Sequence, residues 1–363
     1  MLPKLNFQKR RNYSPIYMND RIIKYTEALK EATDQIMQED QKVFVIGLGV
    51  SYKNGADGTT AGLKDKYPDR VFDVPVSENG FTGMAVGAAI SGLRPIVHHG
   101  RVEFALLASD PIFTQSSKWN YMFGGGNPVP IVFRINIGRQ WGNGPQHTQA
   151  LYSLFGNVPG LKVVVPSTPR MAKGLLSSAI KENSPVVLLE PRWLFNIKQH
   201  VSQELFYEPI DKARIVEEGN QLTLVSYGDG VFSCMEALEL IKDKISVELI
   251  DLVCINPIDF NTITTSVKKT KKLVCVDTTN KSFNIGGEII SKIAQNNGVK
   301  LDLHPSSLSC PDVPCPTSTV LTENYYPTRL DIANRILEIF NYPSIKVDLS
   351  FEELHLAPNK IIK

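Results

Sequence analysis

The chain has 363 residues, about twice the length of a typical domain, so we expect it to form two domains. Hydrophobic residues make up 42% and charged residues 21%, ordinary values for a globular protein that exclude a disordered or fibrous chain. The formal net charge of +2 is close to neutral and argues against a basic surface that binds nucleic acid or an anionic membrane.

The first segment, residues 1–19, is basic and lacks the apolar core of a secretory signal. We expect an exposed N-terminal arm in a cytoplasmic protein, with a short presequence for the mitochondrial matrix as the alternative. No apolar run approaches the roughly 20 residues of a membrane-spanning helix. The five cysteines all lie in the second half of the chain, and their odd number favours a reducing compartment and structural thiols.

Short apolar runs alternate with helical patterns over residues 20–190. The runs are Val43–Ile46, Pro95–Val97, Pro130–Phe133, Lys162–Val165 and Val186–Leu189. Such continuous runs are typical of strands that are buried on both faces of a parallel sheet. One helix is predicted from the shared face of Ala28, Leu29, Ala32 and Ile36, and another begins at Ser167-Thr168-Pro169. The segment is therefore predicted to be an open, mostly parallel α/β domain.

A second α/β series follows a connecting stretch. We expect residues 191–215 to be a linker, because mixed polar residues interrupt the apolar pattern there. Residues 216–345 contain strand-like runs at 222–226, 247–250 and 273–276, separated by helical patterns, and predict a second open α/β domain. Residues 346–363 are expected to form a C-terminal tail.

The segment around Glu78 carries the clearest chemical signal. Glu78 lies at the turn from a predicted strand at 71–73 into a helix rich in Gly and Ala, where a ligand or another backbone can approach closely. It is the only charge near the start of that helix. The simpler interpretation is an acid that interacts favourably with the positive end of the helix. The residue types alone leave both interpretations open.

The sequence resembles the beta subunits of pyruvate and branched-chain 2-oxoacid dehydrogenases over about residues 20–340. The resemblance rests on segments that share their order and spacing with this family: 25–29, 73–81, 92–96, 128–134, 146–149, 159–166 and 312–314. It implies a transketolase-like pyrimidine-binding domain, a transketolase C-terminal domain, and an enzyme that uses thiamine diphosphate. The reaction implied is oxidative decarboxylation of a 2-oxoacid with acyl transfer to lipoamide.

Three residues match functional positions of the family. Glu78 occupies the position of the acid that bonds the aminopyrimidine ring and activates the cofactor, which requires a dry pocket. Phe104 matches an aromatic that packs on that ring, and the alternative is a core phenylalanine. His147 matches a histidine near the reactive carbon that orients or protonates intermediates and assists acyl transfer. The alternative for His147 is a loop histidine bonded to backbone.

The resemblance also implies ions and partners. Residues 228–230, Gly-Asp-Gly, look like the start of a diphosphate and magnesium motif, but in relatives this region binds no diphosphate. An alpha subunit is therefore expected to supply the magnesium and diphosphate half of the site in an α2β2 heterotetramer. A lipoyl acyltransferase is expected to dock through the C-terminal domain. Ala179, Glu182 and Ser184 fall where relatives bind a structural potassium ion.

Three segments depart from the family pattern. Gly47-Leu48-Gly49-Val50 lacks an acidic pair that relatives usually carry. His98-His99-Gly100-Arg101 is more basic than in relatives, which predicts either a more anionic substrate or drift in an interface loop. Arg139-Gln140-Trp141 replaces smaller residues, so we expect a reshaped active-site entrance.

The departures keep two alternatives open. One is a split transketolase or decarboxylase type of thiamine enzyme that does not use lipoamide. The other is a non-catalytic scaffold subunit of the same fold. Retention of Glu78, Phe104 and His147 together argues against the scaffold.

Overall fold

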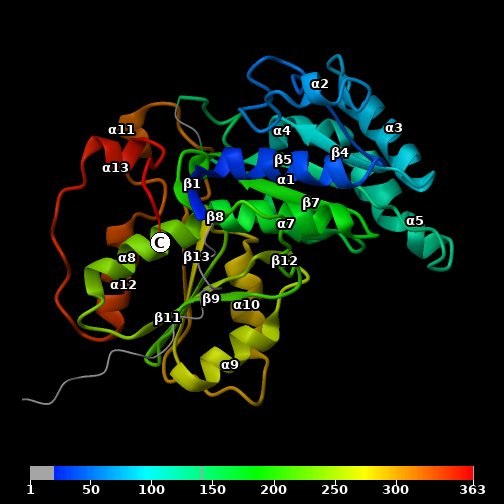
Figure 1. Ribbon diagram of the computed structural model, residues 1–363. Helices are drawn as coiled ribbons and strands as arrows, with labels where there is room; N and C mark the ends of the chain where they lie inside the picture. Colours follow the sequence, from blue (N-terminus) through cyan, green and yellow to red (C-terminus); the bar gives the residue numbers. More distant parts are fainter. Residues whose placement is uncertain (1–19, 140–141, 363) are drawn as a thin grey trace, which may run out of the picture.

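The computed structural model describes residues 20–139 and 142–362. It contains two α/β domains, the first in the upper part of Figure 1 and the second below it. The predicted N-terminal arm and the residues Gln140 and Trp141 lie outside the described residues. No helix in the described ranges is long and apolar enough to cross a membrane. The five cysteines are all buried and unpaired.

The first domain contains a seven-stranded sheet in the order β12-β6-β7-β5-β4-β2-β3, in which only β12 runs antiparallel to its neighbour. Its strands are β2 (Val43–Gly47), β3 (Val71–Asp73), β4 (Arg94–His99), β5 (Val132–Ile137), β6 (Lys162–Val164), β7 (Val186–Pro191) and β12 (Cys254–Asn256). The chain passes from β2 to β3 on one side and then to β4 on the other side of β2. Open α/β sheets commonly bind ligands where the direction of strand addition reverses, which in this sheet is at the carboxyl ends of β2 and β4.

Helices cover both faces of this sheet. On one face α1 (Tyr25–Glu39) packs against α7 (Pro169–Lys181), and the predicted apolar face of α1 is buried. As predicted, the hydroxyl of Thr168 caps α7 by accepting a hydrogen bond from the Met171 N–H. The remaining helices of the domain are α2 (Leu63–Lys66), α3 (Glu78–Ile90), α4 (Val102–Ala105), η1 (Leu106–Ala108), η2 (Asp110–Ser116), α5 (Ser117–Met122) and α6 (Tyr152–Gly156). Of these, α3 packs against β4 and η1 on the opposite face.

The second domain contains a five-stranded sheet in the order β14-β13-β10-β11-β9, with only β9 antiparallel. Its strands are β9 (Arg214–Glu217), β10 (Leu222–Ser226), β11 (Val247–Asp251), β13 (Leu273–Asn280) and β14 (Ser306–Cys310). Its helices are α8 (Asp229–Ile241), α9 (Phe260–Thr270), α10 (Ile285–Ala294), α11 (Thr319–Thr322) and α12 (Arg329–Ile339). The predicted fold class of two open, mostly parallel α/β domains is confirmed.

The segment predicted as a linker is partly regular. Residues 191–215 contain η3 (Arg192–Leu194), β8 (Lys198–Ser202) and the beginning of β9. The strand β8 pairs antiparallel with β1 (Asp20–Lys24), and no apolar run in the sequence indicated either strand. This ladder joins the start of the first domain to the chain that leaves it.

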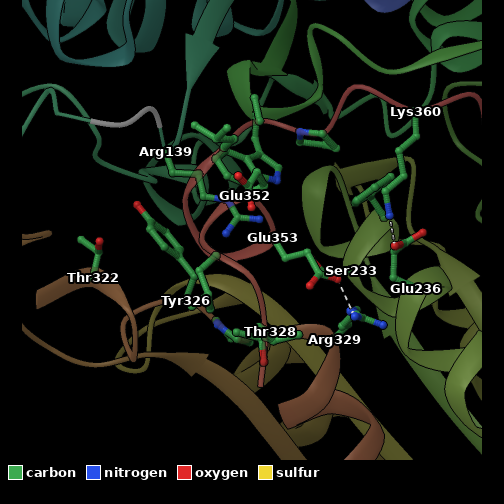
Figure 2. Close-up of a pocket in the computed structure, with 18 of the residues that line it drawn as sticks. Arg139, Ser233, Glu236, Thr322, Tyr326, Thr328, Arg329, Glu352, Glu353 and Lys360 are labelled. Carbon is green, nitrogen blue, oxygen red and sulfur yellow. Dashed lines mark hydrogen bonds and ion pairs between the residues drawn. The ribbon is translucent and has the colours of Figure 1, made fainter. Parts of the chain in front are cut away.

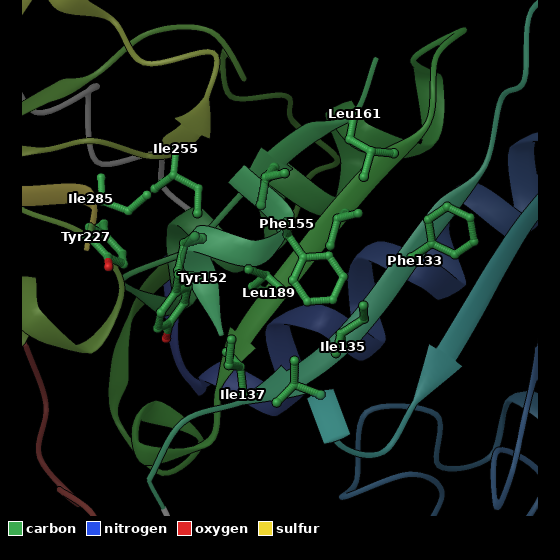
Figure 3. Packing of buried hydrophobic residues seen from close by; sticks show 14 of the residues in the cluster. Phe133, Ile135, Ile137, Tyr152, Phe155, Leu161, Leu189, Tyr227, Ile255 and Ile285 are labelled. Atoms are coloured by element: carbon green, nitrogen blue, oxygen red, sulfur yellow. The ribbon is translucent and has the colours of Figure 1, made fainter. Parts of the chain in front are cut away.

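The two domains share one apolar core, part of which Figure 3 shows. The ring of Tyr152 on α6 meets the ring of Tyr227 edge-on, with centroids 5.0 Å apart. Gly228 has a φ of 53°, and a Cβ atom there would lie 2.8 Å from a methyl group of Val165. The neighbouring Asp229 carboxylate is buried, accepts a hydrogen bond from the Thr278 hydroxyl and lies 3.6 Å from Arg139 Nε. The Gly-Asp-Gly segment therefore serves packing between the domains.

The C-terminal tail returns from the second domain to the first (Figure 1). It contains α13 (Phe351–His355), after which Lys360 forms an ion pair with Glu236 on α8. Ile361 then makes a parallel bridge with Lys198 of β8. The side chain of Ile362 is buried in the core beside α1 and α7. The tail is therefore an integral part of the fold.

Candidate functional site

Glu78 is the first residue of α3, just beyond the carboxyl end of β3. Its side chain is only 6% exposed. Among the described residues, none donates a hydrogen bond to its carboxylate or pairs with it as an ion. The carboxylate oxygens are not among the fully buried polar atoms that lack a partner, so they keep some contact with solvent and are open to a ligand that offers a hydrogen bond.

His99, at the end of β4, fixes the first turns of α3. Its ring stacks on Phe81 with centroids 5.3 Å apart, and its Nε2 lies 3.3 Å from the Thr82 hydroxyl. Phe81 and Thr82 follow Glu78 by three and four residues, which places all three on neighbouring positions of one helix face. Burial lowers the pKa of His99 to about 3, so the ring is neutral near pH 7. A neutral histidine thus holds the helix that carries Glu78.

His98 lies on the opposite face of the same strand, paired in register with Gly47 of β2 and Arg134 of β5. It is also buried, and burial together with the charges of Arg134 and Arg192 holds its pKa well below the usual range. The two histidines add no positive charge to the site. Their lowered pKa values argue against a positive charge from His98 and His99, and the choice between a more anionic substrate and drift in an interface loop stays open.

The structure brings Phe104 and His147 together. Their rings meet edge to face with centroids 5.7 Å apart. Phe104 belongs to none of the apolar clusters formed by the described residues and is 36% exposed, so part of its ring is free to stack on a ligand. No hydrogen bond, ion pair or ring contact of the described residues joins Glu78 directly to either ring.

Two charged side chains hold the loop around His147: Arg101, which the sequence placed only in a basic departure from the family pattern, and Glu103, which it did not single out. Arg101 Nη1 donates a hydrogen bond to the His147 carbonyl over 2.9 Å. The Glu103 carboxylate accepts one from the Gln149 N–H over 2.8 Å. These contacts join positions 46 residues apart, and no spacing rule predicts them.

The Gly47–Val50 departure lies at the carboxyl end of β2. Leu48, in the segment expected from the resemblance to carry an acidic pair, is 38% exposed. The following backbone is held by Asp73 of β3, which accepts hydrogen bonds from Gly49 N and from the N–H and hydroxyl of Ser51. Burial acts to raise the pKa of Asp73, but these hydrogen bonds outweigh it and hold the pKa below its usual value. An acid from β3 therefore orders this loop.

The residues of the predicted potassium site lie where α7 ends. The Ala179 carbonyl accepts a hydrogen bond from Glu182 N, and the Glu182 carbonyl accepts one from Arg94 Nη1 over 2.8 Å. The Glu182 carboxylate pairs with Lys162, and the buried Ser184 hydroxyl has no hydrogen-bond partner in the described part of the chain. Arg94 already brings positive charge to these carbonyls, so a potassium ion here stays a prediction. In the described ranges, no cluster of His, Cys, Asp or Glu side chains is arranged to hold a metal ion.

Arg139 does not lie at a site entrance. Figure 2 shows it inside a cavity of about 370 Å³ between the second domain and the C-terminal tail. Its guanidinium carbon is 3.8 Å from the ring centroid of Trp193 and 4.8 Å from that of Tyr326. Because Gln140 and Trp141 lie outside the described residues, a reshaped active-site entrance at this segment stays a prediction.

Known families match both domains. Residues 21–198 match the transketolase pyrimidine binding domain, and residues 211–332 match the transketolase C-terminal domain. A solved split gene transketolase, described as an inactive beta4 tetramer, has a TM-score of 0.72 to this chain at 19% identity. The match covers 88% of this chain and 98% of the transketolase chain, and it shows that the two share a fold.

Close relatives come from three groups of organisms. The chain is 42% identical over 294 residues to the pyruvate dehydrogenase E1 component subunit beta of Gracilaria tenuistipitata var. liui, covering 80% of this chain and 90% of that protein. It is 38% identical over 322 residues to the mitochondrial pyruvate dehydrogenase E1 component subunit beta of Homo sapiens, covering 87% and 90%. It is 35% identical over 339 residues to the acetoin:2,6-dichlorophenolindophenol oxidoreductase subunit beta of Bacillus subtilis (strain 168), covering 90% and 99%.

Proposed function

The chain belongs to the family of thiamine-dependent dehydrogenase E1 beta subunits, with transketolase-like domains, and we propose that it is the beta subunit of a 2-oxoacid dehydrogenase. The observation that carries the proposal is Glu78, a residue only 6% exposed at the start of α3, whose carboxylate has no partner in the described chain. Thiamine diphosphate, when bound, supplies the electron sink for loss of CO₂ from the 2-oxoacid.

Glu78 and Phe104 fit the aminopyrimidine half of that cofactor. Glu78 would hold the ring nitrogen through a hydrogen bond, which its low exposure would strengthen. Phe104 offers a partly exposed aromatic face on which a flat ring would stack. Together they would orient the ring and hold a proton at the Glu78 carboxyl group.

His147 serves the later part of the reaction. Its half-buried ring contacts Phe104, and its Nδ1 has no hydrogen-bond partner in the described part of the chain. An imidazole with an unpartnered ring nitrogen can serve as a proton donor or acceptor for a bound substrate. In the balanced overall step, the 2-oxoacid loses CO₂ and its two electrons reduce a lipoyl disulfide. One sulfur takes the acyl group, and the other takes a proton.

The remainder of the site is assigned to a second chain. The one diphosphate-like segment in the sequence, at 228–230, is committed to packing between the domains, and its acid is already paired. An alpha subunit in an α2β2 assembly therefore supplies the magnesium and diphosphate half. A lipoyl acyltransferase docks on the assembly and receives the acyl group.

The test is Glu78→Gln in the complex purified with its partner chain. We expect the variant to bind thiamine diphosphate but to lose decarboxylation by a factor on the order of 10²–10⁴, the usual contribution of such an acid. The matched control is Glu288→Gln, the same change at an exposed acid in the first turn of α10. Normal turnover by Glu78→Gln would exclude the proposed role.

The substrate is found by assaying a panel of 2-oxoacids together with acetoin, because one relative is named for acetoin. Each substrate is tested with lipoamide and, separately, with 2,6-dichlorophenolindophenol as electron acceptor. Turnover with the dye alone would favour the split decarboxylase alternative. A complex that binds no thiamine diphosphate and turns over nothing would favour the scaffold subunit.

A further inference from the structure

We infer that Arg101 and Glu103 are positioning residues. They hold His147 beside Phe104 through hydrogen bonds to the loop backbone at His147 and at Gln149. We call this pair the Arg101–Glu103 clamp. The inference rests on the proposed function only for the reaction step in which His147 acts. Its geometric part stands on the contacts alone.

The clamp grips the backbone at two points that bracket His147. Arg101 donates to the carbonyl of His147 itself over 2.9 Å, and Glu103 accepts from the N–H of Gln149 over 2.8 Å. Both partners are backbone atoms, so these bonds fix the path of the chain and leave the imidazole free for chemistry. Hydrogen bonds that involve a charged group are stronger than neutral ones.

Both residues of the clamp belong to, or directly precede, the short helix α4 that follows β4. Arg101 lies two residues beyond β4 and is the N-cap residue of α4, where its carbonyl accepts hydrogen bonds from Phe104 N and Ala105 N. Glu103 and Phe104 are neighbours within α4. The acid that holds the loop and the ring that faces His147 therefore move as one unit, and the clamp sets the distance between the two rings.

In the described chain the loop is also held by hydrogen bonds from Gly138 N to the Gln149 carbonyl and from the Thr148 hydroxyl to the Gly144 carbonyl. Residues 142–151 contain no helix or strand, and Gly142 and Gly144 have positive φ values. The side chains of Gln146, Thr148 and Gln149 line a cavity of about 550 Å³ between the domains. A loop that borders a cavity lacks the packing that would otherwise fix it. Loss of the clamp is therefore expected to let His147 move.

The first test compares two electron acceptors in the assembled complex. Reduction of 2,6-dichlorophenolindophenol reports decarboxylation, whereas lipoamide also requires acyl transfer. We expect Arg101→Ala and Glu103→Gln to lower kcat with lipoamide roughly 10–100-fold, the scale of a misplacement of about 1 Å. Dye reduction should change less than about twofold, because decarboxylation does not depend on the position of His147 in this proposal. Arg101→Lys keeps one donor and should recover part of the loss.

The second test asks whether Arg101 acts through His147. In a His147→Ala background, Arg101→Ala should cause no further loss with lipoamide, because its effect has already been removed. The matched control is Arg70→Ala, which removes a guanidinium that also donates to two backbone carbonyls, those of Asp40 and Val43 at the amino edge of the sheet. It should leave the ratio of the two activities unchanged.

A third measurement separates failure of the clamp from failure of the proposed function. Hydrogen exchange of the peptide covering residues 142–151 should speed up in Arg101→Ala and Glu103→Gln but not in Arg70→Ala. Unchanged exchange, or additive losses in the His147→Ala background, would overturn the clamp while leaving the Glu78 result intact. A wild-type complex without decarboxylase activity would contradict the proposed function. The hydrogen-exchange data would still show whether Arg101 and Glu103 hold the loop at residues 142–151.

Discussion

At the scale of single residues, the carboxyl end of β4 carries two buried histidines whose pKa values lie below the usual range. His98 and His99 are each 2% exposed, and burial is the largest cause of the lowered pKa of both. A histidine that is neutral when folded and free to protonate when unfolded makes stability depend on pH. The edge that carries Glu78 should therefore weaken in acid.

We predict the size of this effect for His99. Its folded pKa of about 3 lies below the unfolded value of 6.5, so its contribution to stability is complete above pH 6.5 and is lost as the pH falls toward 3. In that window one such group lowers the free energy of unfolding by about 1.4 kcal/mol per pH unit. The glutamine in His99→Gln cannot protonate. The free energy of unfolding of this variant, measured by denaturant between pH 7 and 4, should therefore fall with decreasing pH by about 1.4 kcal/mol per pH unit less than that of the wild type.

The control for this prediction is His304→Gln, at an exposed position of the second domain. It should leave the slope as in the wild type. An unchanged slope in His99→Gln would mean that His99 protonates without unfolding, and that α3 is held by other contacts.

At the scale of elements, the sequence predicted the strands that have strong local patterns. Runs in β2, β4, β5, β6 and β7 are apolar because both faces of the sheet are covered, and they were found for that reason. The strand β12 was missed, because three residues, Cys254–Asn256, owe their conformation to pairing with β6 and not to their own pattern.

The same division applies to the candidate site. Glu78, Phe104 and His147 were proposed because a family motif surrounds each of them. The loop contacts of Arg101 and Glu103 were not predicted, since they join distant positions. The surroundings of Arg139 were not predicted either, because the sequence alone did not reveal that the tail and the second domain enclose it.

The C-terminal tail allows a prediction from two adjacent isoleucines. Ile362 is 8% exposed in the core beside α1 and α7, whereas Ile361 is 59% exposed. We expect Ile362→Ala to lower the free energy of unfolding by about 2 kcal/mol, the low end for an isoleucine truncated in a core. Ile361→Ala should stay within about 0.5 kcal/mol of the wild type. Equal Tm values for the two variants would show that the tail does not stabilise the fold.

At the scale of the whole molecule, the described chain presents one face of α3 that nothing covers. Gly80, Gly83 and Gly87 are exposed on this helix, and Met84 beside them is 63% exposed. A Cβ added at Gly83 or Gly87 would meet no atom within 4 Å. Small residues on a helix let another backbone come close, and α3 begins with Glu78. We expect the partner chain to pack on this face and to close the site over the Glu78 carboxyl.

Gly83→Leu tests this arrangement without harming the free chain. Replacing an exposed helical glycine by leucine should stabilise the isolated helix by up to about 1 kcal/mol, so the Tm of the chain alone should stay equal or rise. In the assembly the added side chain would occupy the space of the partner, so we expect loss of co-purification with the alpha subunit and of thiamine diphosphate binding. The control is Gln38→Leu, at an exposed position near the end of α1 and the amino edge of the sheet. An intact complex with normal cofactor affinity in Gly83→Leu would place the partner on another face, and Glu78 would then need a different group to complete its pocket.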